Sequence, residues 1–259
     1  MTYNYSKALI IAPHSDDEIF TLPFIYSPEN NIFKIDLLLI QYDELRFQEA
    51  LRSAKIHNFN LIRFPANIKI KESYFHLYLE ELYLFFNKIW DRYDLVLSPA
   101  IEGGHQDHDS VSAALILSKE KFAKKTNIFL YSTYRNIDWF PYAYTCGLSK
   151  KISEKNITSL EMPSNWFKMF VLTIISCYKS QLKTWVLLFL PIMISFFKGN
   201  LKKFIIANNL DNKDIKLFIP KKPLYQIYRN CNKDEWLKAY SLMCKKIYNN
   251  EDFYKCKKI

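Results

Sequence analysis

The chain has 259 residues, a formal net charge of +10, 49% hydrophobic residues and 17% aromatic residues. This composition is typical of a globular protein and excludes a largely disordered one; the length suits one large α/β domain or a domain with an appendage. The positive charge would suit nucleic acid, anionic lipid or a phosphorylated substrate. Lysine, asparagine, isoleucine and tyrosine are frequent throughout, however, so the charge is a weak indication and we expect no nucleic acid partner.

The five cysteines are odd in number, widely spaced and without a C-x-x-C pair. We therefore expect free thiols in a reducing cytoplasm. Residues 1–7 are too short and polar to form a signal peptide before the first predicted strand. These features predict a cytoplasmic protein, with a peripheral position at the inner face of the membrane as the alternative.

Apolar runs and helical patterns alternate along the first half of the chain. Continuous apolar runs predict strands, and apolar residues three and four apart predict helices. Their alternation predicts a Rossmann-like, doubly wound, mostly parallel sheet with helices on both faces and a helical, apolar C-terminal extension. We expect a catalytic core over 1–145 and an extension over 146–259 packed on the same domain. The strands are predicted at 8–12, 33–40, 61–64, 94–98 and 127–131, and the helices at 18–26, 44–57, 72–90 and 111–122.

Two polar clusters follow predicted strands. Residues 13–18 follow the first strand directly, and residues 105–109 follow the fourth strand after Gly103 and Gly104, which are half of the four glycines. In a sheet of order 3-2-1-4-5, strands one and four are neighbours, and ligands bind at their carboxyl ends. We therefore expect the two clusters to meet in one crevice, with the glycines shaping the second loop.

Together the clusters offer donors suited to zinc or another divalent ion of the first transition row. His14, Asp17 and His108 would form a three-ligand set that leaves positions for water, which is the catalytic pattern. Asp16 is then a carboxylate that can take a proton from the water, and His105 lies three residues before His108. A hydrogen-bonded loop histidine and an acidic helix start would explain each cluster alone. The two clusters at one crevice favour the metal site.

The two other histidines, His57 and His76, are predicted to lie on helix surfaces, and we assign them no role.

Residues 12–18 (Ala-Pro-His-Ser-Asp-Asp-Glu) and 105–108 (His-Gln-Asp-His) resemble the two signature motifs of the PIG-L/LmbE-type zinc-dependent N-deacetylases. The family usually has Ala-His-Pro-Asp-Asp-Glu and His-Pro-Asp-His. Here the proline precedes His14, and Gln106 replaces the second proline. Neither change touches a metal ligand, and the resemblance extends plausibly over residues 1–140.

The resemblance implies one zinc ion on His14, Asp17 and His108, with Asp16 as general base. It implies that His105, oriented by Asp107, is the acid that steadies the oxyanion and protonates the leaving amine. Such an acid works as an imidazolium, and a carboxylate partner is expected to keep it charged. Glu18 is expected to open the following helix and support the loop.

Weaker similarities are Arg46 with its helix neighbours, and residues 178–181. Arg46 would contact substrate hydroxyls or phosphate, since a guanidinium is a forked donor. A solvated arginine on a helix surface is an equal alternative.

These features predict an amidase that removes the N-acetyl group from an N-acetylated amino sugar. An N-acetylglucosamine-type glycan, carried on a nucleotide-linked or lipid-linked precursor, is the expected substrate. A metal-dependent phosphoesterase with two ions in its site, or a catalytically silent sugar-binding protein, is the alternative.

Residues 166–197 are unusually apolar, interrupted only by three lysines. The longest uncharged run, 184–197, contains Pro191 and is shorter than the roughly 18 residues that a spanning helix needs. We therefore predict no transmembrane anchor. A helical pair packed on the sheet is slightly favoured over a peripheral membrane contact through 166–203, in which Trp185 and flanking lysines would lie against anionic lipid. Another amphipathic helix is predicted around 235–248.

Overall fold

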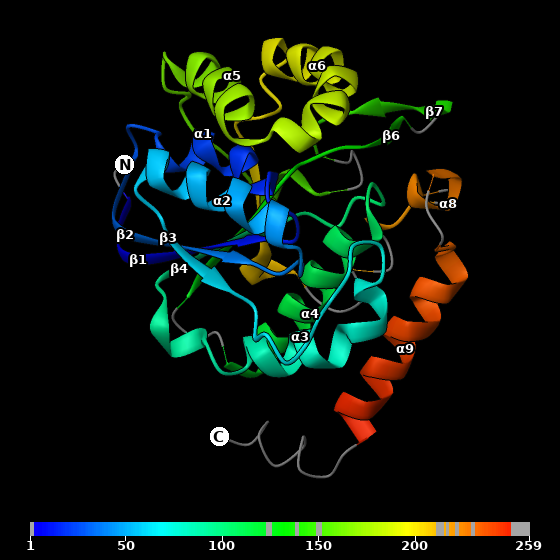
Figure 1. Ribbon diagram of the computed structural model, residues 1–259. Coiled ribbons are helices and arrows are strands. Elements are labelled where there is room, and N and C mark those ends of the chain that lie inside the picture. Colours follow the sequence, from blue (N-terminus) through cyan, green and yellow to red (C-terminus); the bar gives the residue numbers. More distant parts are fainter. Residues whose placement is uncertain are drawn as a thin grey trace.

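The computed structural model describes residues 3–122, 126–137, 140–148, 152–210, 215, 218–220, 223–228 and 231–249. A seven-stranded sheet of order β3-β2-β1-β4-β5-β9-β8 is covered by helices on both faces (Figure 1). The first five strands are parallel, which confirms the predicted fold class and strand order. The strands are β1 (Tyr3–Ala12), β2 (Asn30–Leu39), β3 (Asn60–Arg63), β4 (Leu95–Pro99), β5 (Asn127–Tyr131), β8 (Ile157–Ser159) and β9 (Lys203–Ile206).

Strands β9 and β8 were not predicted. Strand β9 pairs antiparallel with β5, and β8 pairs antiparallel with β9. The chain after residue 145 therefore extends the sheet itself. A separate antiparallel pair is formed by β6 (Arg135–Ile137) and β7 (Phe140–Thr145).

The apolar runs are continuous because both faces of the sheet are covered. Leu9 and Ile11 of β1 belong to one core cluster, whereas Ala8 and Ile10 belong to the other. Helices α3 (Leu79–Phe86), α4 (Gln106–Phe122) and α9 (Lys233–Asn249) cover the first face. Helices α1 (Leu22–Ile25), α2 (Glu44–His57), α5 (Trp166–Cys177) and α6 (Leu182–Phe197) cover the second (Figure 1). A short helix, α8 (Tyr225–Tyr228), precedes α9.

Local signals set the ends of α2. The Asp43 side chain accepts a hydrogen bond from the Arg46 N–H (2.9 Å), which caps the first turn. Asn58 ends the helix in the left-handed conformation, with φ 56°. The observed helix matches the predicted range 44–57.

The predicted helix over 72–90 is wrong in detail. The segment consists of the 3₁₀ turn η2 (Phe75–Tyr78), α3 and a second 3₁₀ turn, η3 (Trp90–Arg92). The Asp107 carboxylate accepts the backbone N–H groups of Ser73 (2.6 Å) and Phe75 (3.1 Å), which holds the start of the segment outside a regular helix. The predicted helix at 18–26 likewise starts as a 3₁₀ turn, η1 (Asp17–Thr21), before α1. The remaining 3₁₀ turns are η4 (Glu154–Asn156), η5 (Lys179–Gln181) and η6 (Ala207–Asn209).

The prediction of surface positions for His57 and His76 is wrong. Both side chains are buried. His57 lies between Tyr26 Oη (3.0 Å from Nδ1) and Thr173 Oγ1 (2.9 Å from Nε2), because α5 packs over this end of α2. Helix α9 packs against η2, which carries His76.

Helix α6 packs on the domain along one side only. Trp185, Leu188, Ile192 and Ser195 recur at intervals of three and four and are buried. The opposite side of α6 is exposed. The predicted packing of this helix on the domain therefore holds for its inner side only. With η5, the segment Lys179–Phe197 has 19 residues and a mean hydropathy of 1.5. In the described residues it is the one helix that is long and apolar enough, by length and composition, to cross a membrane. It is longer than the uncharged run 184–197 because it also includes Lys179 and Lys183.

Candidate metal centre and catalytic cavity

The loops that follow β1 and β4 meet at the carboxyl end of the sheet. Strand β1 pairs directly with β4, with Ala8 opposite Leu95 and Ile10 opposite Leu97. This pairing brings His14 Nδ1 within 3.2 Å of His108 Nε2, although 94 residues separate them. The predicted convergence of the two clusters is therefore observed.

Glycine is required at both positions before His105. Gly103 has φ +69°, and a Cβ there would lie 2.4 Å from Pro220 Cδ. A Cβ at Gly104 would lie 1.7 Å from the carbonyl oxygen of Tyr134. The Asp109 carboxylate also accepts the backbone N–H groups of Glu102 (3.0 Å) and Gly103 (3.2 Å), which fixes the loop.

Three donor groups form a compact triangle. The distances are 3.2 Å from His14 Nδ1 to His108 Nε2, 3.3 Å from His14 Nδ1 to Asp17 Oδ2, and 3.1 Å from His108 Nε2 to Asp17 Oδ1. Ligands about 2.0–2.2 Å from a tetrahedral zinc ion lie roughly 3.3–3.6 Å apart. All three residues are at most 5% exposed. The donor set and its spacing therefore fit a divalent ion.

Both histidines of the triangle have a partner on their other ring nitrogen. His14 Nε2 lies 3.0 Å from Asp107 Oδ2, and His108 Nδ1 lies 3.1 Å from Thr133 Oγ1. Such partners fix the tautomer and the ring orientation of a metal ligand. Asp107, predicted to orient His105, lies closer to His14: its carboxylate is 3.8 Å from His105 Nδ1.

The protonation states of His14 and Asp17 are set by their hydrogen-bond partners. Burial opposes charge on His14, but the hydrogen bonds of Asp107 and Asp17 outweigh it and raise the pKa of His14 to about 10. Burial likewise opposes charge on Asp17, but His108 and His14 hold the pKa of that carboxyl well below its usual range. A divalent ion bound here would compete with the His14 proton, so its affinity would fall at low pH.

Asp16 is held beside the triangle by two donors. Its Oδ1 lies 3.3 Å from Arg46 Nη2, and its Oδ2 accepts the Trp185 Nε1–H at 3.1 Å. Burial raises the pKa of Asp16, and the Arg46 guanidinium opposes that rise.

Arg46 is only 7% exposed, so the alternative of a solvated arginine is wrong. Its Nη1 lies 3.6 Å from a Glu49 carboxylate oxygen. Glu49 in turn accepts the Ser180 N–H (2.9 Å) and Oγ–H (2.7 Å), which ties residues 178–181 to α2.

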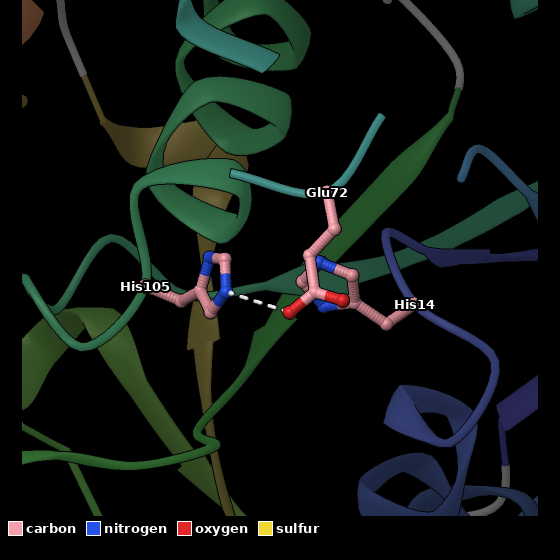
Figure 2. A group of neighbouring side chains, drawn as sticks. All are labelled: His14, Glu72 and His105. Carbon is pink, nitrogen blue, oxygen red and sulfur yellow. Dashed lines mark ion pairs between the residues drawn. The ribbon is translucent and has the colours of Figure 1, made fainter. Parts of the chain in front are cut away.

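The expectation that Asp107 keeps His105 charged is wrong, because burial outweighs the carboxylate and lowers the pKa of His105 to about 4. The Asp107 backbone N–H donates to His105 Nδ1 (3.1 Å), so the neutral ring carries its proton on Nε2. That nitrogen lies 3.8 Å from Glu72 Oε1. Donor atoms of His14, Glu72 and His105 lie within 4.8 Å of one another (Figure 2).

Glu18 ties three segments together behind the site. It is fully buried, and its Oε1 accepts hydrogen bonds from Ser53 Oγ (2.5 Å) and the Tyr178 hydroxyl. Burial raises the pKa of Glu18 to about 8. Its position agrees with the expected support of the loop.

A cavity of about 50 Å³ lies beside the donor triangle and has room for a few water molecules. Its polar side includes His14, Asp16 and His105, and α6 supplies an apolar wall with Trp185 and Leu188. Sequence patterns did not single out Glu72 as part of the site, nor did they place Trp185 there. The full lining is His14, Asp16, Asp17, Phe20, Arg46, Glu72, His105, Tyr134, Gln181, Thr184, Trp185 and Leu188.

No protein-family model matches the sequence, and no curated protein matches it. The fold is similar to three solved structures of a deacetylase of teicoplanin biosynthesis. The deacetylase–bog complex has 14% identity and a TM-score of 0.48, covering 70% of this chain and 86% of that chain. A zinc-inhibited form has 14% identity and a TM-score of 0.47, covering 68% and 85%. The teicoplanin complex has 12% identity and a TM-score of 0.46, covering 68% and 88%.

Proposed function

We propose that this protein is a metal-dependent hydrolase, with zinc as its ion, that removes the N-acetyl group from an N-acetylated amino sugar. The observation that carries the proposal is the buried triangle of His14, Asp17 and His108 at a cavity that also holds Asp16 and His105. Pure sugar binding requires neither a buried carboxylate beside a metal centre nor an imidazole donor in the same cavity. The motif resemblance points to the same chemistry.

When bound, a divalent ion supplies Lewis acidity, which polarises a carbonyl and acidifies a water. Asp16 accepts the proton of the attacking water, and its position between Arg46 and Trp185 keeps the carboxylate directed into the cavity. The His105 Nε2–H donates a hydrogen bond to the amide oxygen as negative charge develops there. Asp16 then returns the proton to the amide nitrogen, the C–N bond breaks, and acetate and the free amine result.

Arg46 is proposed to contact substrate hydroxyls or phosphate. It lines the cavity, and its Nε has no hydrogen-bond partner among the described residues. A forked guanidinium beside the reacting centre suits the oxygen-rich face of a sugar or its phosphate carrier. A nucleotide-linked or lipid-linked N-acetylglucosamine-type glycan offers both.

One observation favours the two-metal phosphoesterase as a second candidate: the donor group of His14, Glu72 and His105 lies beside the triangle. Both groups share His14, however, and its Nε2 is already paired with Asp107. Simultaneous occupation would require His14 to bind two ions while losing that partner. Metal counting on the purified protein distinguishes the candidates, with one equivalent of zinc expected.

The decisive experiment combines acetate release with metal content. Zinc-loaded protein is assayed on nucleotide-linked and lipid-linked N-acetyl sugars. Asp16→Asn is expected to lower kcat by about 10²–10⁴-fold and to retain zinc, whereas His108→Ala loses both activity and zinc.

Asp43→Asn is the matched control for the Asp16 substitution. This exposed residue caps α2, and asparagine caps equally well, so activity and zinc content remain unchanged. Full activity of Asp16→Asn would refute the mechanism. Absence of acetate release from every substrate would refute the function.

A further inference from the structure

Helices α5 and α6 expose apolar side chains to solvent, and two of these, Ile175 and Val186, line one groove between the helices. We use the term apolar face for six residues that are 52–78% exposed: Leu172, Ile175, Val186, Leu187, Leu190 and Phe197. Single exposed apolar residues are ordinary on a protein surface, whereas a contiguous group marks an interaction site. Figure 1 shows both helices at the edge of the molecule, on the outer side of the layer formed by α1 and α2.

All charged side chains between residues 162 and 210, the range that contains α5 and α6, have one sign. From residue 162 to residue 210 the sequence contains no aspartate or glutamate, and it contains six lysines. Lys168, Lys179, Lys183 and Lys198 are exposed, and Lys202 and Lys203 are half-buried. An apolar helix face with flanking cations is complementary to an anionic lipid surface, where apolar side chains enter the headgroup boundary and lysines meet phosphates.

The apolar face lies next to the catalytic cavity. A groove of about 310 Å³ between α5 and α6 is lined by apolar side chains, among them Phe170, Ile174, Val186 and Phe189. Trp185 lines both this groove and the cavity. A hydrocarbon chain resting on α6 would therefore end close to Asp16, which Trp185 contacts.

We propose that α5 and α6 dock on an anionic bilayer, with the apolar face at the headgroup level, and that the cavity receives a lipid-linked substrate there. The helix lies on the bilayer and does not cross it, because its inner side is fixed to the domain by Trp185 and by the hydrogen bond from Ser195 Oγ to the Cys146 carbonyl. The substrate part of this inference rests on the proposed function. The docking part does not.

The test uses the full chain and vesicles of phosphatidylcholine, with or without phosphatidylglycerol. In flotation, the protein is expected to bind the anionic vesicles at low salt and to dissociate as salt rises. Leu190→Glu is expected to weaken this binding by roughly tenfold, since it places a charge in the apolar face. Phe33→Glu makes the same change at a residue that is 91% exposed on β2, and is expected to leave binding unchanged.

Failure of the wild-type protein to bind anionic vesicles at low salt would overturn the docking. An equal loss of vesicle binding in Leu190→Glu and Phe33→Glu would also overturn it. A lipid-free dimer in light scattering that Leu190→Glu dissociates would also overturn it and assign the face to a second copy. Leu190 lies outside the cavity lining, so Leu190→Glu is expected to keep full activity on a water-soluble N-acetyl sugar. Vesicle binding without acetate release from any substrate would refute the proposed function alone.

Discussion

At the scale of single residues, Asp17 joins the two halves of the site. One carboxylate oxygen accepts the backbone N–H of His14 (2.8 Å) and faces its ring, and the other faces His108 in the first turn of α4. Asp107 has a comparable role outside the triangle. It contacts His14 Nε2 and accepts hydrogen bonds from the backbone N–H groups of Ser73 and Phe75. Each carboxylate thus fixes both an imidazole ring and the backbone segment beside it.

His57 gives a pH prediction at this scale. Burial lowers its pKa to about 4, against about 6.5 in an unfolded chain. The unfolded chain therefore binds the extra proton between these values, so stability is full above pH 6.5 and falls as the pH drops towards 4. The loss is on the order of 3 kcal/mol at most. His57→Gln is expected to flatten the pH dependence of the free energy of unfolding in urea over this window.

Lys55→Gln on the exposed side of the same helix is the control, and it should retain the wild-type slope. If the free energy of unfolding of His57→Gln depends on pH as steeply as that of the wild type, His57 does not contribute to this pH dependence.

The sequence identified the donors that follow strands but not the residues that reach the site from elsewhere. His14, Asp17 and His108 stand out because polar side chains interrupt apolar runs at the carboxyl ends of β1 and β4. Glu72 and Trp185 have no such local signal. Trp185 lies in an apolar helix 169 residues from Asp16, and only tertiary packing brings its indole to that carboxylate.

At the scale of elements, α6 is both a wall of the cavity and a support for Asp16. Trp185 stacks on Phe20, with ring centroids 5.7 Å apart, and donates to Asp16 Oδ2. Trp185→Phe removes the donor and keeps an aromatic ring. We expect kcat to fall by roughly tenfold with little change in KM, because one hydrogen bond that positions the base is lost.

Trp166→Phe is the matched control for this substitution. Trp166 is equally buried, on α5, and its Nε1 has no hydrogen-bond partner within the described ranges. Its substitution should leave kcat unchanged. Equal losses in the two variants would indicate a general packing effect instead of positioning of Asp16.

The ends of an element were predictable where the apolar spacing and the local end signals agreed. Helix α2 has a cap at Asp43 and a left-handed stop at Asn58, and its predicted range holds. Residues 72–90 keep their helical apolar spacing, yet Asp107 captures the backbone donors near the start and breaks the helix. Strand β8 was missed because its three residues are too few to show a pattern, whereas β9 is as long as the predicted strand β3 and was not recognised after the apolar helix.

At the scale of the whole molecule, the metal site links segments that are remote in sequence. The unfolded chain does not hold His14, Asp17 and His108 together, so an ion that binds them stabilises the folded state. At a free zinc concentration 100 times Kd, the free energy of unfolding should rise by about 2.7 kcal/mol. Thermal unfolding with zinc and with a chelator measures this difference.

His108→Ala is expected to show no zinc-dependent shift in Tm, whereas Asp43→Asn should show the full shift. A wild-type Tm that does not respond to zinc would contradict the assigned donor set.

A cytoplasmic location remains a prediction, and vesicle binding would place the protein peripherally at the membrane.

The hydrogen bond between Trp185 and Asp16 has a thermodynamic consequence. One side of helix α6 is proposed to bind lipid, and its other side holds Asp16, the proposed base, through Trp185. Vesicle binding and substrate binding therefore belong to one thermodynamic cycle. If vesicles tighten substrate binding by some factor, substrate must tighten vesicle binding by the same factor. If the proposed coupling holds, the protein would leave the bilayer most readily when its cavity is empty.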